Sequence, residues 1–483
     1  MKAYEHRSIG DTAAGAAKVN LGGEVRGERF LLSFGDVLAL SGDFFRPVDA
    51  TDGLFGLARK AGEAGTVVDS SDEIVCALKV STLDEAVTDS RFEPGGQFAS
   101  FQFSPGADRT DVERRVRDRY LGLAAVNDDH FAAPGTSDGA TNGFGSALSA
   151  YRNLHQVALD HAWRLGGRGG DLSRSMAREA AAQHYLTDAF AAGHLRTPVA
   201  AIRRYWKARY PAFWDQLRRK VGSETAAALR EVSPVMRLLP RGFLDRRTLC
   251  ELTIRTSQYP ELSLGDLVAR AFHDWDNDRG LKLRGGGVIF GDGHIDEGQT
   301  RQLALGAARA GIDDVELAFR LGASGTTRGG EALYERVRVL TGAPRGAFLA
   351  EEKLPRLSPD NPEQNWRATD IEILWDSPMV GGTGATVGDA LGAMLEPGGE
   401  FIRQVEALGQ GLSGVHGVFA VPLLGAWLSD RCGQAYRRGF VDPLAHDPQR
   451  ALHALVGSTD PHRAPALSTG DTAGDVAAPV IPA

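Results

Sequence analysis

The chain has 483 residues, of which 42% are hydrophobic, with a net charge of −8 and a pI of about 5.9. This length suffices for two or three domains, or for one large helical domain with additions. The acidic balance argues against stable binding of duplex DNA, which calls for a basic surface. Three widely separated cysteines, Cys76, Cys250 and Cys432, indicate neither a disulfide framework nor a thiolate zinc cage. The first residues contain no apolar run of the secretory type, so we expect a cytoplasmic protein.

The first sixty residues predict a helix that ends next to a carboxylate. Between Phe30 and Phe45 the apolar residues recur with helical spacing, and the pattern stops at Ser41 and Gly42. Asp43 follows directly. A carboxylate just past a buried helix is commonly a cap or turn residue, but this one is also well placed to point into a site.

Two further helices are expected before the middle of the chain. The first, at about residues 111–126, has a polar face of arginines and aspartates and leads into the pair His130-Phe131. The second, at about residues 147–165, carries two histidines for which we favour structural roles, with orientation of a metal ligand as the alternative. They are His155 and His161.

The stretch Ala181–Pro198 is the strongest candidate for a site. His184 and Asp188 stand four residues apart, so their side chains share one face of a helix. Gly193 interrupts the helical pattern just before His194, which lets that imidazole approach from a bend. Imidazole and carboxylate are the ligands that catalytic zinc takes in proteins. The alternative is a set of hydrogen-bonded core residues without a metal.

Beyond this stretch the sequence predicts more helices and one hairpin. Residues 200–245 are basic and aromatic, which indicates a solvated amphipathic helix or, alternatively, a surface that stacks on bases and contacts phosphates. A later helix carries His273 and ends in a crowd of carboxylates. Residues 281–293 predict a β-hairpin with a glycine turn. Helices should follow at about residues 297–321 and 330–340.

The last third of the chain is proline-rich at first and becomes helical again near Val387. The uncharged segment Ala407–Ser429 is interrupted by glycines and a proline, so we favour a buried helix pair or a hydrophobic substrate wall over a membrane span. Three units are therefore expected: a helical domain over residues 1–340, a C-terminal helical extension over 341–457 and a disordered tail over 458–483.

Together these residues resemble the zinc-dependent phospholipase C / P1 nuclease superfamily, whose members are mostly helical and hold up to three zinc ions at the end of a bundle. The most specific match is the motif HYxxD with a histidine ten residues after its first, here His184 to Asp188 with His194. The pair His130-Phe131 resembles the family's His-Phe pair. His6 and Asp43 resemble its early histidine and its first aspartate. The resemblance implies a mostly α, multi-helix phospholipase C/P1 nuclease-like bundle with a small β-hairpin and a C-terminal helical extension.

The resemblance, which covers roughly residues 1–300, also implies a ligand set for two to three zinc ions. One ion is expected on Asp43, His130, His184 and Asp188. Asp188 should bridge to a second ion, which His6 and the N-terminal amine and carbonyl would hold.

A third ion is expected on His194, a later histidine and a carboxylate. The family's late pair is HxxxE or HxxxD, soon after the central motif. Here the only suitable histidine is His273, far downstream, and Asn277 stands four residues beyond it. We therefore predict Asp276 as the carboxylate, with Asp274 as the alternative. The family commonly uses a processed terminal tryptophan as a ligand, whereas this chain begins with methionine.

The implied function is a phospholipase C-like phosphoester hydrolase in which Asp43 serves as ligand and either orients the attacking water or acts as its base. Alternatives are a P1-type single-strand nuclease, an esterase of small phosphorylated metabolites, and a non-enzymatic helical protein with a structural metal site. Phe131 would line the substrate pocket or belong to the core. Arg196 would contact phosphate, because a guanidinium matches two phosphate oxygens, or else cap a helix or form a salt bridge.

Overall fold

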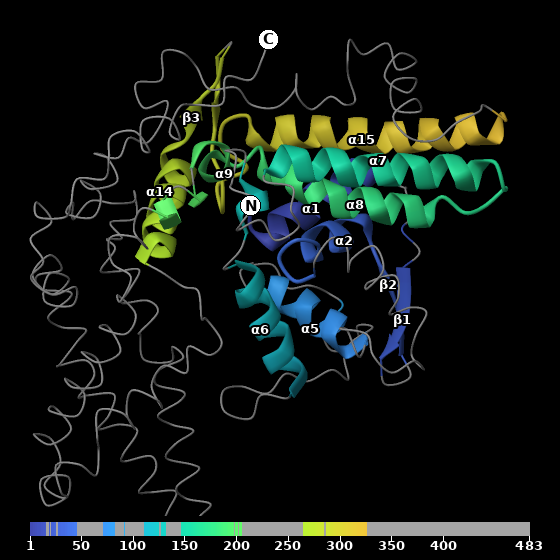
Figure 1. The fold of residues 1–483 in the computed structure, drawn as a ribbon, viewed down its shortest axis with the longest axis horizontal. Helices are drawn as coiled ribbons and strands as arrows, with labels where there is room; N and C mark the ends of the chain where they lie inside the picture. Colours follow the sequence, from blue (N-terminus) through green and yellow to red (C-terminus); the bar gives the residue numbers. More distant parts are fainter. Residues whose placement is uncertain are drawn as a thin grey trace, which may run out of the picture.

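The computed structural model describes residues 1–15, 19, 21–25, 28–45, 71–82, 91, 111–124, 127–131, 146–197, 199–200, 202–204, 264–284 and 286–325. Within these residues the protein is mostly helical, with two antiparallel sheets of two strands each (Figure 1). The elements are α1 (Ala3–Ala14), β1 (Leu21–Val25), β2 (Glu28–Leu32), α2 (Phe34–Leu40), α5 (Ser71–Thr82), α6 (Asp111–Ala124), the 3-10 helix η3 (Asp128–His130), α7 (Ala147–Gly166), α8 (Ser173–Asp188), α9 (Ala192–Arg196), α14 (Leu264–Arg279), β3 (Leu281–Lys282), β4 (Val288–Ile289) and α15 (Thr300–Ala323).

The mostly helical class is confirmed, and a hairpin forms where one was predicted, with Leu281 paired to Ile289. Most of residues 200–245, the helix expected at 330–340, the extension at 341–457 and the tail at 458–483 lie outside the described residues. None of the described helices combines the length and apolar character that a membrane crossing needs.

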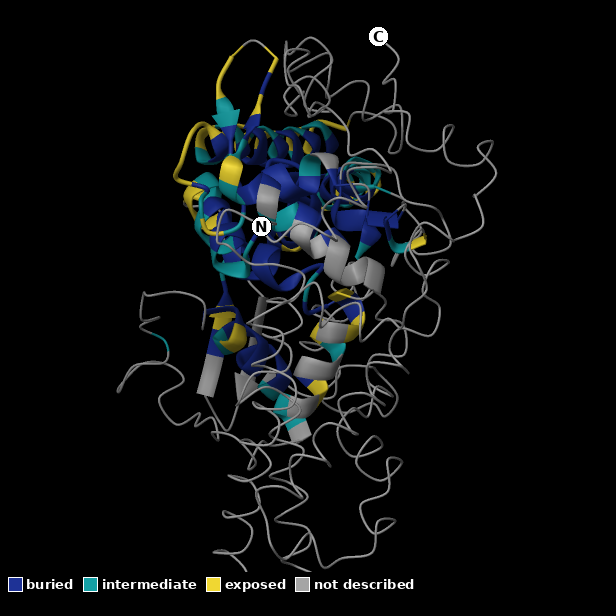
Figure 2. Cartoon of the chain, turned by 90° about the vertical axis from the view of Figure 1, so that its left-hand side faces the viewer, coloured by how far each residue is buried: buried dark blue, intermediate teal, exposed yellow. Residues whose placement is uncertain are grey.

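Three long helices, α7, α8 and α15, lie side by side and form the body of the fold (Figure 1). Their facing sides are rich in alanine and are buried, as Figure 2 shows for the interior of the bundle. Small residues let the backbones approach closely. A Cβ on Gly166 would lie 2.1 Å from the Phe319 carbonyl oxygen, and one on Gly322 would lie 2.0 Å from that of Trp163. Glycine at both positions therefore allows the end of α7 to touch α15 backbone to backbone.

The predicted helix between Phe30 and Phe45 is only partly correct. Residues up to Leu32 belong to strand β2, which pairs with β1, and the helix α2 begins after Ser33. Ser33 accepts a hydrogen bond from the Asp36 amide at 3.0 Å, and Asp36 accepts one from the Ser33 amide, so a capping box fixes the start of the helix. The strand was missed because its pairing partner is rich in glycine and has no alternating apolar pattern.

A buried ionic cluster joins the three long helices. The Nδ1 of His155 on α7 lies 2.6 Å from a carboxylate oxygen of Glu179 on α8, and its Nε2 lies 3.6 Å from one of Asp314 on α15. Gly311 makes room for the cluster, because a Cβ there would lie 2.4 Å from Glu179 Oε1. Burial alone would lower the pKa of His155, but the two carboxylates outweigh it and raise the pKa to about 10. The resulting stabilisation is fully present below the unfolded pKa of about 6.5 and is lost as pH rises through about 10.

Replacing His155 by leucine should lower the free energy of unfolding of the metal-free protein by about 3–5 kcal/mol. The leucine fills similar space, but Glu179 and Asp314 are left buried without their counter-charge. Urea unfolding followed by circular dichroism measures the change. Val157→Ala, on the exposed side of the same helix, is the control and should stay within about 0.5 kcal/mol of the original protein. Equal stabilities for the two variants would contradict the ionic role of His155.

Candidate metal centre

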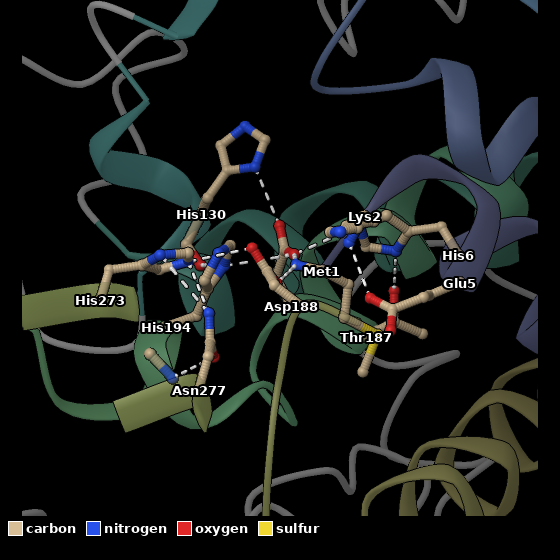
Figure 3. A network of polar contacts seen from close by, with 12 residues as sticks. Met1, Lys2, Glu5, His6, His130, Thr187, Asp188, His194, His273 and Asn277 are labelled. Atoms are coloured by element: carbon tan, nitrogen blue, oxygen red, sulfur yellow. Dashed lines mark hydrogen bonds and ion pairs between the residues drawn. The ribbon is translucent and has the colours of Figure 1, made fainter. Parts of the chain in front are cut away.

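Histidine and aspartate side chains from six parts of the chain meet near the end of α8 that carries Asp188. Figure 3 shows His6, His130, His194 and His273 around Asp188. They come from α1, the turn after α2, η3, α8 with the adjacent α9, α14, and the loop after β4. Three groups place their ligand atoms within 4.8 Å of one another and could each hold a metal ion. The groups are His6, Asp43 and His184; His130, His184 and Asp188; and His194, His273 and Asp292.

The group around His130 and His184 has the spacing of a coordination shell. His130 Nδ1 lies 3.2 Å from His184 Nε2 and 2.9 Å from Asp188 Oδ2. His184 Nε2 lies 3.5 Å from the same carboxylate oxygen, and Asp43 Oδ1 lies 4.0 Å from both ring nitrogens. A tetrahedral ion with bonds of about 2.0–2.1 Å holds its ligand atoms about 3.3 Å apart. Of the four side chains predicted for the first ion, His130, His184 and Asp188 have about this spacing, whereas Asp43 lies farther away and is grouped with His6 and His184.

The glycine before Asp43 decides how closely this turn approaches the imidazoles. Gly42 has a φ of 86°, and a Cβ on it would lie 2.3 Å from His184 Cδ2 and 3.0 Å from His130 Cε1. A side chain at this position would therefore displace the two rings. The carboxylate of Asp43 is 27% exposed, whereas that of Asp188 is 1% exposed. Asp43 consequently lies on the open side of the centre.

Asp188 is the shared member of the cluster. Its Oδ2 faces His130 and His184, while its Oδ1 lies 2.7 Å from the Met1 amine and 3.3 Å from His6 Nε2. Burial opposes ionisation of this carboxyl, but the amine and the surrounding imidazoles outweigh it and hold the pKa of Asp188 well below its usual range. The two oxygens of one carboxylate therefore face two separate sets of donor atoms. The bridging position of Asp188 stays a prediction.

The third group corrects the predicted carboxylate. Asp276 is buried on α14 but belongs to none of the three groups, and Asp274 accepts a hydrogen bond from His273 Nδ1 at 2.8 Å. The other ring nitrogen, Nε2, lies 3.3 Å from Asp292 Oδ2. His273 thus directs Nδ1 toward its own helix and Nε2 across to the loop after β4. A carboxylate between two glycines just past a strand was the available signal for Asp292, and helical spacing could not reveal it.

Asn277 stands where the family pattern has a carboxylate, and it ties two segments together. Its Oδ1 accepts a hydrogen bond from the Gly193 amide at 2.6 Å, and its amide nitrogen lies 3.1 Å from His273 Nε2. A Cβ on Gly193 would lie 2.3 Å from the His273 carbonyl oxygen. The absence of a side chain there lets α9 lie against α14, which brings His194 next to His273, with ring centroids 4.8 Å apart.

Phe131 supports the imidazoles directly. Its ring stacks on His194 at a centroid distance of 4.8 Å and lies edge-on to His273 at 6.1 Å, and the residue is 6% exposed. This position matches the core alternative considered for Phe131 more closely than a substrate wall. Arg196 is the last residue of α9, but its side chain lies outside the described part of the structure.

Two of the rings direct Nδ1 at a backbone carbonyl, and Nδ1 of His194 also lies 3.2 Å from Asp188 Oδ1. His184 Nδ1 donates to the Leu38 carbonyl at 3.0 Å, and His194 Nδ1 donates to the His130 carbonyl at 3.1 Å. Each ring then carries its hydrogen on Nδ1 and keeps a lone pair on Nε2, which is the usual preparation of a metal-binding histidine. Burial lowers the pKa of both rings, that of His194 to about 4, so both remain neutral near pH 7.

Two buried atoms of this cluster, His6 Nε2 and Asp292 Oδ1, have no hydrogen-bond partner. His6 Nε2 faces Asp188, and Asp292 Oδ1 lies 3.2 Å from the Met1 amine. Burial disfavours the charged amine, yet Asp188 and Asp292 raise its pKa to about 11. Neutral imidazoles, carboxylates and unsatisfied acceptor atoms directed at common points are a donor set that fits divalent metal ions.

Comparisons with models of protein families, with curated proteins and with solved structures find no match. The interpretation of the centre therefore rests on its geometry and on the motifs in the sequence.

Replacing Asp292 by asparagine should remove one metal ion per chain, or weaken its binding by more than about 10-fold, because a charged ligand of the third group is lost. Asp276→Asn tests the carboxylate first predicted and should leave the metal content unchanged. Metal analysis of both proteins after dialysis against a weak chelator gives the comparison. Loss of metal from the Asp276 variant alone would show that Asp276 on α14, and not Asp292, is the ligand.

Proposed function

We propose that this protein is a metal-dependent hydrolase of phosphoesters and that its metal is zinc. The observation that carries the proposal is the placement of Asp188, whose two oxygens face separate donor sets. One carboxylate shared in this way suits ions about 3.5–4 Å apart, the arrangement used by enzymes that cleave phosphate esters. The resemblance of the central motif to the phospholipase C / P1 nuclease superfamily supports the same reaction class. Imidazole with carboxylate favours zinc over magnesium or calcium.

Zinc bound at this centre would polarise a phosphoryl oxygen and lower the pKa of a coordinated water. The protein contributes to the reaction through its carboxylates and through the groups that position them. Asp188 is buried and ionised, and it holds the two sets of donor atoms at a fixed separation. His184 and His194 stay neutral, so they remain available as ligands near pH 7. No serine or cysteine nucleophile is required by this scheme.

Asp43 is assigned the role of base. It lies on the open side of the centre, and burial raises its pKa above the usual range, although His130 opposes the shift. A carboxylate whose pKa lies closer to neutrality is better matched to accepting a proton. In the proposed step the water oxygen attacks phosphorus and Asp43 accepts the proton. The bond from phosphorus to the leaving oxygen breaks, and that oxygen keeps the electron pair and takes up a proton from water.

The substrate class extends to three kinds of phosphoester: phospholipid headgroup esters, single-stranded nucleic acid and small phosphorylated metabolites. The net charge of −8 favours the first over the polyanionic second. The uncharged segment Ala407–Ser429, which also favours a lipid substrate, lies outside the described residues. A phospholipase C-like activity is therefore the first to test, and Arg196 remains the predicted phosphate contact. The cytoplasmic location likewise stays a prediction.

A metal count combined with a substrate panel tests the proposal. We expect two to three zinc ions per chain and hydrolysis of bis-p-nitrophenyl phosphate, with phosphatidylcholine vesicles, an oligodeoxythymidylate and small phosphate monoesters separating the three substrate kinds. Asp188→Asn should lose zinc and lower turnover by more than about 100-fold, because it removes the charged bridge. A single tightly held zinc with no hydrolysis of any substrate would instead indicate a structural metal site.

Replacing Asp43 by asparagine should lower kcat about 10²–10⁴-fold at saturating zinc, because the amide keeps an oxygen for coordination but accepts no proton. Steady-state kinetics with bis-p-nitrophenyl phosphate, accompanied by a zinc count, measures this. An unchanged kcat in a fully loaded variant would exclude Asp43 as the base and leave it a ligand only.

A further inference from the structure

Thr187 lies on α8 between the predicted ligands His184 and Asp188, and its hydroxyl faces His6 on α1. It is fully buried and directly precedes Asp188. Its Oγ1 lies 2.8 Å from the Gln183 carbonyl oxygen, 3.0 Å from that of His184 and 2.7 Å from His6 Nδ1 (Figure 3). The hydroxyl thus connects α8 to the imidazole that α1 contributes to the centre.

The direction of each hydrogen bond follows from counting protons. A threonine hydroxyl has one hydrogen, and the carbonyl oxygens of Gln183 and His184 can only accept, so the hydroxyl donates to them. With the hydroxyl hydrogen directed at these carbonyls, its oxygen accepts from His6, and the hydrogen of that ring then sits on Nδ1. The lone pair of His6 is left on Nε2, the buried atom without a hydrogen-bond partner that faces Asp188 Oδ1 at 3.3 Å.

Asp188 acts on this ring in the opposite sense. A carboxylate oxygen at that distance attracts a hydrogen on Nε2, and a hydrogen there would occupy the lone pair that a metal needs. Thr187 favours the other tautomer, because a buried Nδ1–H finds its acceptor in the hydroxyl. His184 and His194 direct Nδ1 at backbone carbonyls, which no substitution removes. His6 depends on a side chain for the same purpose.

We propose that Thr187 is a positioning residue that fixes the tautomer and direction of His6 and so prepares the subsite that His6 shares with the Met1 amine and Asp188. The inference rests on the proposed metal centre. Without the hydroxyl, His6 either buries an unsatisfied Nδ1–H or moves its hydrogen to Nε2 and donates to Asp188. Both outcomes weaken binding of the ion at this subsite. Binding of the ion between His194 and His273 is unaffected, since among the described residues the Thr187 hydroxyl bonds to His6, Gln183 and His184 and not to those two rings.

Thr187→Val tests the proposal, because valine keeps the shape and removes the hydroxyl. Affinity for the ion at the His6 subsite, measured by titration of the full-length protein with zinc against a chromophoric chelator, should fall about 10–100-fold, with the remaining ions bound as before. Thr187→Ser is the matched control, since it retains the oxygen and should restore the original affinity. Urea unfolding of the metal-free variants checks that both are folded.

The tautomer is read independently of metal. Nitrogen-15 spectra of histidine-labelled, metal-free protein should show His6 with its hydrogen on Nδ1 in the original and serine proteins, and shifted toward Nε2 in the valine variant. His6→Gln identifies the signal. Unchanged zinc affinity and an unchanged tautomer in Thr187→Val would overturn the proposal. If the original protein bound no zinc at all, the proposed function would fail, while the spectra would still decide whether Thr187 sets the tautomer.

Discussion

The centre depends on one ionised carboxylate held inside the protein. Asp188 is 1% exposed, and burial of an isolated charge is costly unless opposite charges or donors surround it. Here the Met1 amine, His6 and His194 lie around one oxygen, and His130 and His184 lie around the other. The segments that provide these groups are brought together because each has a partner at this carboxylate.

The bundle makes that arrangement possible by bringing backbones close together. Glycines at the contacts of α7 with α15, at the turn before Asp43 and on α9 all stand where a Cβ would collide with a neighbour. The absence of side chains at Gly42 and Gly193 lets the functional groups approach, while the alanine-rich faces of the long helices hold α8 in place. The buried His155 cluster adds an ionic connection among the same helices, on residues of α8 that lie before His184. The site and the core therefore use the same close contacts.

The sequence was most informative where local spacing carries the chemistry. His184 and Asp188 are four residues apart on one helix, and the resemblance suggested by this motif pointed to His6, Asp43, His130 and His194, which the structure brings to the same place. Spacing failed for Asp292. The search for an acidic partner of His273 followed the helix and chose Asp276, whereas the observed neighbour comes from a loop after a hairpin. Strand β2 was missed for a related reason, because its pairing with a glycine-rich partner is a tertiary contact without a local pattern.

The loop origin of Asp292 gives the three donor groups unequal protection. The carboxylate of Asp292 is 24% exposed and the ring of His273 13%, whereas His184 is fully enclosed. Opening the helices is thus unnecessary for solvent to reach the third group. Solvent also reaches Asp43 on the open side of the centre, whereas the side chains of His130, His184 and Asp188 are at most 6% exposed. An ion held by His194, His273 and Asp292 would exchange with the surroundings faster than one held by the buried His130, His184 and Asp188, so replacement of the native metal by another should proceed in steps, beginning at the hairpin.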